Sequence, residues 1–216
     1  MHALSFKLRI VHTVTRSEPT VPKLTKGQKT RQAIINEATN ILVNEGYENF
    51  VIRQIAKRVG IQPGNLQYYY PTKKELLWEV LTPESDKYED TYLKLAEKAT
   101  TKSGKVLALV DFLIADIREK ATCNIWFTIW ALAPHDDEVA EIMDRFYLKY
   151  NESLSRLLRH ADPDMPEQRS KHLACLLTAL FDGMTNQIGY GKSKHEFHVG
   201  IEDELRSAVL ALVGVS

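Results

Sequence analysis

The segment from Gly60 to Leu77, GIQPGNLQYYYPTKKELL, gathers side chains whose chemistry suits a nucleic acid. Three of its residues carry amides, Gln62, Asn65 and Gln67. An amide donates and accepts hydrogen bonds at once, as the edges of base pairs require. Two further residues offer hydroxyl groups to phosphate oxygens, Tyr68 and Tyr69. We therefore predict that this segment contacts the bases and phosphates of double-stranded DNA.

Neighbouring residues support the same contact through backbone geometry and charge. Gly64 permits close approach, and Pro63 rigidifies the start of a helix while giving up an amide that the helix leaves unpaired. Lys73 stands at the start of the next helix, where the helix dipole also attracts anions. Lys26 and Arg53 add positive charge on the flanking helices.

Charge is divided unevenly along the chain, although the formal net charge of the 216 residues is +0. Residues 1–74 hold 12 Lys/Arg and 4 Asp/Glu, a balance of +8, whereas residues 75–216 hold 16 Lys/Arg and 24 Asp/Glu, a balance of −8. A basic first third favours a polyanionic partner. The alternative is that the charged side chains are merely solvated and have no partner, and that the tyrosines pack in the core of a small three-helix unit. We expect core packing for Leu66 and Tyr70.

Apolar residues recur at three- and four-residue steps over nearly the whole chain, which predicts an all-α fold. We expect helices at 26–44, 51–59, around 65–69, from 73 to about 99 with a break at Thr82–Pro83, and at 103–119, 121–132, 136–160, 167–190 and 200–213. The first three have the order of a helix-turn-helix unit, whose third helix lies in the major groove. We divide the chain into a flexible extension, 1–24, a helix-turn-helix DNA-binding domain, 25–72, and a larger helical ligand-binding and dimerisation domain, 73–216.

The stretch IRQIAKRVGIQPGNLQYYYPTKKELL resembles the DNA-binding signature of the tetracycline-repressor (TetR) family. The matching residues are Ile55, Ala56, Gly60, Ile61, Leu66, Tyr69, Tyr70, Lys73 and Leu76. The resemblance implies a homodimer, a small-molecule pocket in the C-terminal part, and repression that a ligand relieves. Two positions depart from the family pattern. Val51 and Ile52 stand where members often place a phosphate-binding Ser or Thr, and Gln67 follows Leu66 where a tyrosine is frequent.

The last two long helices carry apolar stripes that we expect to form a dimer interface between two copies of the chain. The predicted interface residues are Leu173, Leu177, Leu180, Met184, Leu205, Val209 and Leu212. Dimerisation would place two recognition helices about 34–36 Å apart, on successive turns of the major groove. The alternative is that both stripes pack inside one chain.

Aromatic residues gather in the middle helices, where we predict a pocket for a small-molecule effector of unknown identity. The candidates are Trp126, Phe127, Trp130, Phe146, Tyr150 and Phe181. Aromatic rings bury large areas and often line such pockets, although core packing is the default use of any one of them.

Other site classes find little support in the sequence. Cys123 and Cys175 are far apart and predict reduced thiols, and His195 and His198 lack a third metal ligand. The HDDE run at 135–138 is better explained as a helix cap than as a metal site. No catalytic motif is present, and no apolar run reaches the roughly 18 residues of a membrane span. We expect no catalytic residue, metal, cofactor or membrane contact, and a cytoplasmic location.

These observations predict a ligand-responsive DNA-binding transcriptional regulator, a repressor that binds a palindromic operator as a homodimer and is released by a small molecule. Two alternatives stay open. One is a helical enzyme whose basic N-terminal part binds an anionic substrate, and the other is a small-molecule-binding protein with a vestigial DNA-binding region.

Overall fold

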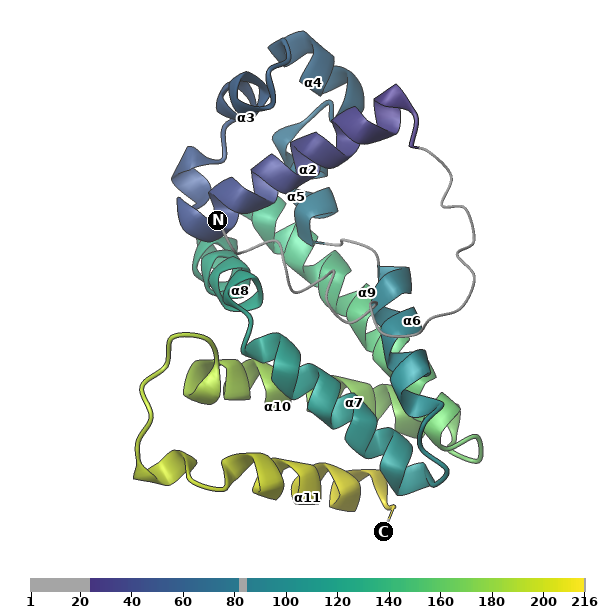
Figure 1. Cartoon of the computed structure of the whole chain (residues 1–216). Coiled ribbons are helices and arrows are strands. Elements are labelled where there is room, and N and C mark those ends of the chain that lie inside the picture. Colours follow the sequence, from purple (N-terminus) through teal and green to yellow (C-terminus); the bar gives the residue numbers. More distant parts are fainter. Residues whose placement is uncertain (1–23, 82–84, 216) are drawn as a thin grey trace, which may run out of the picture.

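The computed structural model describes residues 24–81 and 85–215, and every regular element among them is helical, as the sequence predicts. The α-helices and the short 3₁₀ helices, marked η, follow one another as α2 (Lys26–Asn44), η1 (Tyr47–Asn49), α3 (Ile52–Val59), α4 (Pro63–Tyr69), α5 (Lys73–Leu81), α6 (Ser85–Ala96), α7 (Lys102–Ile117), α8 (Lys120–Leu132), η2 (Ala133–His135), α9 (Asp137–Ala161), α10 (Glu167–Ile188), η3 (Glu196–His198) and α11 (Ile201–Val213). In Figure 1, α3 and α4 lie at one end of the molecule, and α10 and α11 lie at the other.

Local side-chain chemistry fixes where several helices begin and end. The Thr25 hydroxyl accepts the Gln28 N–H while the Gln28 side chain accepts the Thr25 N–H, a capping box that starts α2. Gly60 ends α3 with a φ of 78°, a left-handed conformation that glycine adopts without strain. The Asp136 carboxylate accepts the N–H groups of Glu138 and Val139 and caps α9, as expected for the acidic run at 135–138.

The helix-turn-helix unit of α2, α3 and α4, here called the head, shares one hydrophobic core with α5 and with part of α8, η2 and α9. Its buried residues are Ile34, Ala38, Ile41, Leu42, Phe50, Ile55, Ala56, Leu66, Tyr70, Leu76, Leu77, Val80, Leu81, Ile129, Ala133, Val139 and Ile142. Leu66 and Tyr70 are therefore core residues, as predicted. The first turns of α9 thus pack against the head although they follow it by more than sixty residues.

A second core joins α6, α7, α10 and α11 to the later turns of α9, and these elements are here called the body. The central helices α7 and α10 each present an apolar stripe to it, for example Leu109 and Leu113 on α7 and Leu173 and Leu177 on α10. Because α9 runs through both cores, it is a continuous connection between head and body (Figure 1).

Two predictions fall on residues outside the described ranges. The break expected at Thr82–Pro83 lies between the end of α5 at Leu81 and the start of α6 at Ser85, and residues 82–84 themselves are not described. Of the extension predicted at 1–24, the structure describes Leu24 alone.

Candidate functional site

The outer face of α4 carries the residues predicted to contact DNA. Gln62, Asn65 and Gln67 are exposed, and Tyr68 is 82% exposed. A tyrosine ring exposed to this extent near the end of a short helix gains little from the protein core, because most of its apolar area stays in water. Around Gly64 a Cβ atom would meet nothing within 4 Å, so the open surface there leaves room for another molecule.

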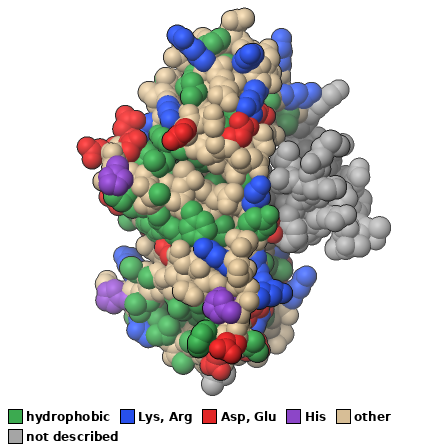
Figure 2. Space-filling model, turned by 90° about the vertical axis from the view of Figure 1, so that its left-hand side faces the viewer, with side chains coloured by type: hydrophobic (Ala, Val, Ile, Leu, Met, Phe, Trp, Pro, Cys, Tyr) green, Lys and Arg blue, Asp and Glu red, His purple; other side chains and the backbone are tan. Residues whose placement is uncertain are grey.

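Basic side chains surround this face, and Figure 2 shows Lys and Arg gathered over the end of the molecule that carries α3 and α4. Lys26, at the start of α2, and Arg53, in α3, are both exposed. Two other arginines of the head form ion pairs with glutamates of the same chain. Arg58 forms a bidentate pair with Glu45, and Arg31 pairs with Glu79 at 3.0 Å. Part of the positive charge counted in the first third is therefore balanced by carboxylates of α2, of the segment after it and of α5.

Lys73 has a more enclosed position than the sequence suggested. Its ammonium lies 3.6 Å from the centre of the Tyr47 ring, a cation–π contact, and is half-buried. Burial lowers the pKa of Lys73, because the charged form loses hydration, and the nearby Asp136 and Glu138 partly oppose this. The side chain stands at the N-terminus of α5, beside the capping box that Thr72 and Glu75 form.

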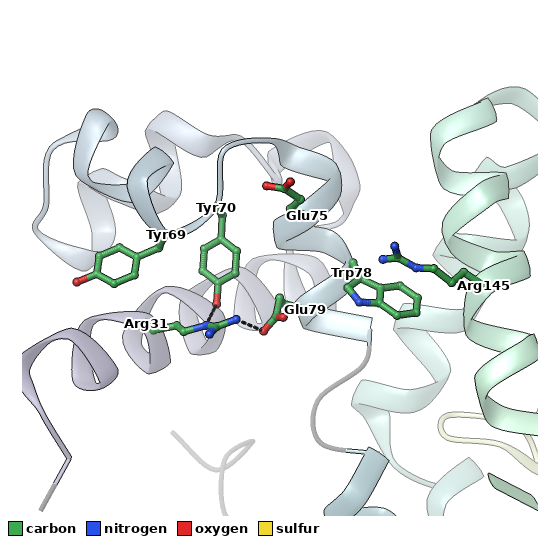
Figure 3. A pocket seen from close by; sticks show the side chains of 7 residues that line it. All are labelled: Arg31, Tyr69, Tyr70, Glu75, Trp78, Glu79 and Arg145. Atoms are coloured by element: carbon green, nitrogen blue, oxygen red, sulfur yellow. Dashed lines mark hydrogen bonds and ion pairs between the residues drawn. The ribbon is translucent and has the colours of Figure 1, made fainter. Parts of the chain in front are cut away.

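Between the head and α9 the surface is hollowed into a pocket of about 280 Å³ (Figure 3). Its lining residues are Arg31, Tyr69, Tyr70, Glu75, Trp78, Glu79 and Arg145. Arg31 donates from Nε to the Tyr70 hydroxyl at 3.0 Å and pairs with Glu79, so it ties α2 to the end of α4 and to α5. Two arginines face two glutamates in this pocket, and their formal charges cancel. The lining therefore favours neither a cation nor an anion.

Four of the six residues predicted to line an effector pocket form one ring cluster between α8 and α9. Trp126 lies 4.4 Å from Phe146 and 6.2 Å from Trp130, between ring centres, and Phe146 stacks on Tyr150 at 5.6 Å. The cluster also includes Tyr147, whose ring centre is 5.8 Å from that of Trp126. Rings at these separations make favourable aromatic contacts.

A partly buried hydrogen-bond chain crosses this cluster. The Trp130 indole N–H donates to the Tyr147 hydroxyl at 2.8 Å, and the Tyr147 hydroxyl donates to the carboxylate of Asp182 on α10 at 2.7 Å. Burial raises the pKa of Asp182, which the hydrogen bond from Tyr147 partly offsets. Burial and the neighbouring Asp182 also raise the pKa of Tyr147, so this phenol stays protonated. Neither Tyr147 nor Asp182 was a predicted site residue.

The remaining two candidates for the effector pocket lie elsewhere. Phe127 contacts Trp130 at 5.8 Å but lines a separate hollow of about 320 Å³ at the end of α2, with the ammonium of Lys192 at 4.7 Å from its ring. Phe181 is 4% exposed and belongs to the core of the body. It lies one residue before Asp182 on α10, on the helix face that packs inward.

Most of the predicted dimer residues are already buried within one chain. Leu173, Leu177, Met184, Leu205 and Val209 are each at most 8% exposed, and Leu180 is partly buried against the same core. Among the predicted set, Leu212 keeps an exposed side chain, at 38%. The sequence left open that the apolar stripes of the last two helices pack inside one chain, and these six residues do so.

A different face of the same two helices remains uncovered. On α10 it comprises His172, Cys175, Leu176, Ala179, Gly183, Asn186 and Gln187, and on α11 it comprises Glu204, Ser207, Ala208, Ala211 and Leu212. Leu176 is 50% exposed, and a Cβ atom at Gly183 would meet nothing within 4 Å. The small side chains leave room for the close approach of another helix.

Metal and membrane sites find no support in the part of the chain that the structure describes. His195 and His198 lie with their ring centres 3.7 Å apart, and no group of three or more His, Cys, Asp or Glu residues is placed to hold a metal ion among residues 24–81 and 85–215. Within the same ranges, no helix is long and apolar enough to cross a membrane.

Two family models match this chain. Residues 34–80 match the bacterial regulatory proteins of the tetR family, and residues 104–212 match the C-terminal part of the BetI-type transcriptional repressors. Among curated proteins, the HTH-type transcriptional regulator PksA of Bacillus subtilis (strain 168) is 25% identical over 172 residues, which cover 76% of this chain and 80% of PksA. The HTH-type regulator BetI of Escherichia coli (strain UMN026) is 23% identical over 167 residues, covering 76% of this chain and 84% of BetI.

Solved structures share the arrangement of the helices. Salmonella enterica GusR superposes with a TM-score of 0.67 at 22% identity and covers 89% of this chain and 99% of its own. A transcriptional regulator from Saccharomonospora viridis, solved in complex with choline, superposes with a TM-score of 0.57 at 21% identity and covers 86% and 96%. At these identities the likeness is one of fold.

Proposed function

Because the chain belongs to the TetR family of transcriptional regulators, we propose that it binds a palindromic operator as a homodimer and leaves the operator when a small molecule binds its C-terminal part. It is a DNA-binding regulator of the repressor type, and the family and its relatives are regulators rather than enzymes. The cytoplasmic location predicted from the sequence is part of the same proposal, because the protein must be in the compartment that contains its operator DNA.

The observation that carries the proposal is the open face of α4. Its exposed amides, Gln62, Asn65 and Gln67, would contact base edges in the major groove, and Gly64 would lie where the duplex approaches most closely. Tyr68, with its exposed hydroxyl, would bond to phosphate. Tyr69 and Lys73 would bond to the same strand from their half-buried positions, with Lys26 and Arg53 attracting the backbone from outside.

Dimerisation would use the uncovered face of α10 and α11. The exposed Leu176 and Leu212 supply apolar area, while Ala179 and Gly183 allow two copies of α10 to cross closely. The helices α10 and α11 lie at the end opposite to α3 and α4 (Figure 1). A twofold axis that runs along the molecule from the first end to the second would place both heads on the same side of the dimer.

For the effector, the ring cluster supports a small organic cation as the ligand class. Trp126, Trp130, Phe146 and Tyr147 present aromatic faces, which attract cations, and Asp182 adds a partly buried carboxylate. Choline, the ligand of the similar structure from Saccharomonospora viridis, is a cation of this class. The rings contact one another in this structure, so a ligand would have to separate them, and α8 or α9 would move as a result.

The experiment that tests the function is selection of bound duplexes from a random library at several salt concentrations, using the full-length protein. We expect a palindrome whose half-sites lie about one helical turn apart, and an affinity that falls steeply with salt. Asn65→Ala should weaken binding to the selected sequence and leave non-specific binding unchanged. Retention of duplexes that share no sequence would contradict the proposal.

Choline then provides a first probe of the effector class. We expect it to lower the affinity of the wild type for the selected duplex, and we expect Asp182→Asn or Trp126→Ala to weaken this response. A response to a neutral or anionic compound in place of a cation would contradict the ligand class and leave operator binding intact.

A further inference from the structure

The helices α5 and α9 meet in two side-chain contacts that lie one helical turn apart on both helices. Lys74 forms an ion pair with Glu141, and four residues further along each helix the guanidinium of Arg145 lies 3.4 Å from the centre of the Trp78 ring. Residues four apart share one face of a helix. The two contacts therefore fix both the distance between α5 and α9 and the rotation of one helix about the other.

On the head side, α5 is firmly connected to the recognition helix α4. Glu79, which follows Trp78, pairs with Arg31, and Arg31 donates to the hydroxyl of Tyr70 directly after α4 (Figure 3). Tyr70 itself is 2% exposed and belongs to the core of the head. A displacement of α5 therefore carries the C-terminal end of α4 with it.

On the body side, α9 carries the ring cluster directly after the contact with α5. Phe146 and Tyr147 follow Arg145 in sequence, and Tyr147 is bonded to Asp182 of α10. The helix runs without interruption from Asp137 to Ala161 and contains neither glycine nor proline, the residues at which helices usually kink. A shift of Tyr147 is thus passed to Arg145 through rigid helix.

We propose that Trp78 and Arg145 are positioning residues, which hold the head at the orientation needed for DNA binding and transmit the state of the ring cluster to it through α9. This inference rests on the proposed function, in which α4 contacts DNA and the ring cluster binds the effector. The ion pair of Lys74 with Glu141 assists by fixing the same two helices one turn earlier. The route does not pass through residues 82–84.

Hydrogen exchange followed by mass spectrometry tests this positioning role on the full-length protein, without DNA and without effector. We expect Arg145→Ala to speed exchange in peptides of α5 by about two- to fivefold, the change that follows from losing one cation–π contact at a partly exposed site. Peptides of α7 and α10, in the core of the body, should exchange at the wild-type rate. Lys149→Ala, at an exposed residue one turn further along α9, is the matched control and should leave α5 unchanged.

A charge exchange separates positioning from a general loss of stability. Lys74→Glu should speed exchange in α5, and Lys74→Glu combined with Glu141→Lys should restore much of the protection. Equal exchange of α5 in Arg145→Ala and the wild type would overturn the proposal, as would faster exchange throughout the body.

Transmission is tested by a second change at the ring cluster. Tyr147→Phe removes the hydroxyl that joins Trp130 to Asp182, and we expect it to alter exchange in α5 of the wild type but not in the Arg145→Ala background. An equal effect in both backgrounds, or no effect in the wild type, would refute a route through Arg145. None of these measurements involves DNA, whereas duplex selection tests the proposed function itself. A failure of this inference can therefore be distinguished from a failure of the proposed function.

Discussion

The hydroxyl of Tyr147 donates a hydrogen bond of 2.7 Å to the carboxylate of Asp182 and thereby joins α9 to α10 beside the ring cluster. A hydrogen bond to a charged acceptor is among the stronger ones that proteins form. Burial nevertheless disfavours the charged carboxylate more than this bond favours it, since the pKa of Asp182 in the folded chain lies above its ordinary value of 3.8.

This balance predicts a pH dependence of stability. Because the folded pKa of Asp182 is raised, the native state binds more protons than the unfolded state between the two pKa values. The contribution of this group is therefore most favourable below its unfolded pKa, and it is lost as the pH rises through the folded pKa. Asp182→Asn keeps an acceptor for Tyr147 and removes the charge. We expect the free energy of unfolding of the variant, relative to the wild type, to increase from about pH 4 to about pH 7.

Urea denaturation at both pH values measures this difference. Asp144→Asn, which removes a carboxylate from an exposed position of α9, is the control. If Asp182→Asn and the wild type changed in parallel over this range, the assigned cost of burying the carboxylate would be wrong.

A second prediction separates stability from DNA binding at Gly64. This residue lies in the first turn of α4, where an added Cβ atom would meet nothing within 4 Å. Alanine is the better helix former by up to about 1 kcal/mol, so Gly64→Ala should raise the free energy of unfolding or leave it unchanged. Its methyl group would project toward the duplex, and we expect weaker binding to the selected operator. Unfolding curves and duplex titrations check the two effects separately, and an affinity equal to that of the wild type would place the duplex away from Gly64.

The proposed dimer face gives a third prediction, at Gly183. The single chain has space for a side chain there, whereas two copies of α10 crossing at Ala179 and Gly183 would not. Gly183→Leu should therefore leave the helical content intact and shift the protein from dimer to monomer in sedimentation velocity. Ala115→Leu, on an exposed face of α7, is the matched control and should remain dimeric. A dimeric Gly183→Leu variant would mean that another surface forms the dimer.

A side chain at Gly189 is expected to lower the stability of the protein by overpacking. A Cβ atom at this position would lie 2.3 Å from the Thr185 carbonyl oxygen, 2.9 Å from the Cys123 sulfur and 3.2 Å from the Ile117 carbonyl oxygen. Two of these atoms belong to the backbone and cannot turn aside. We expect Gly189→Ala to lower the free energy of unfolding by about 1–3 kcal/mol, measured by urea denaturation. Gly64→Ala, on the open surface of α4, should cost little by comparison. Equal costs at the two glycines would contradict this steric account.

The helices could be predicted from the sequence because hydrophobic periodicity and capping residues act locally. The predicted 26–44 agrees with α2, and the helix cap predicted in the run at 135–138 is formed by Asp136. The outer face of α4 could be predicted for the same reason, since its amides and tyrosines lie close together along a single short helix.

The hydrophobic pattern of the sequence does not show which distant segments contact one another. An amphipathic stripe shows which face of a helix is buried, but not whether the same chain or a second copy covers it. Leu173 and Val209 were therefore predicted at a dimer interface, although the body of one chain already encloses them. The pairing of Tyr147 with Asp182 joins residues 35 apart in sequence, and no local signal connects them. The charge count likewise misses the pairing of Arg58 with Glu45.

The core of the head includes Ile129, Val139 and Ile142 from α8 and α9, and this has a consequence for how such proteins can be recombined. A chimera joined at residue 72 would separate Leu66 and Tyr70 from the helices that complete their core. The transplanted head would expose apolar surface, and the new host would have to supply a matching one. A graft of DNA specificity onto another regulator is therefore better made by exchanging the outer face of α4, from Gln62 to Tyr68, while its inner face is kept.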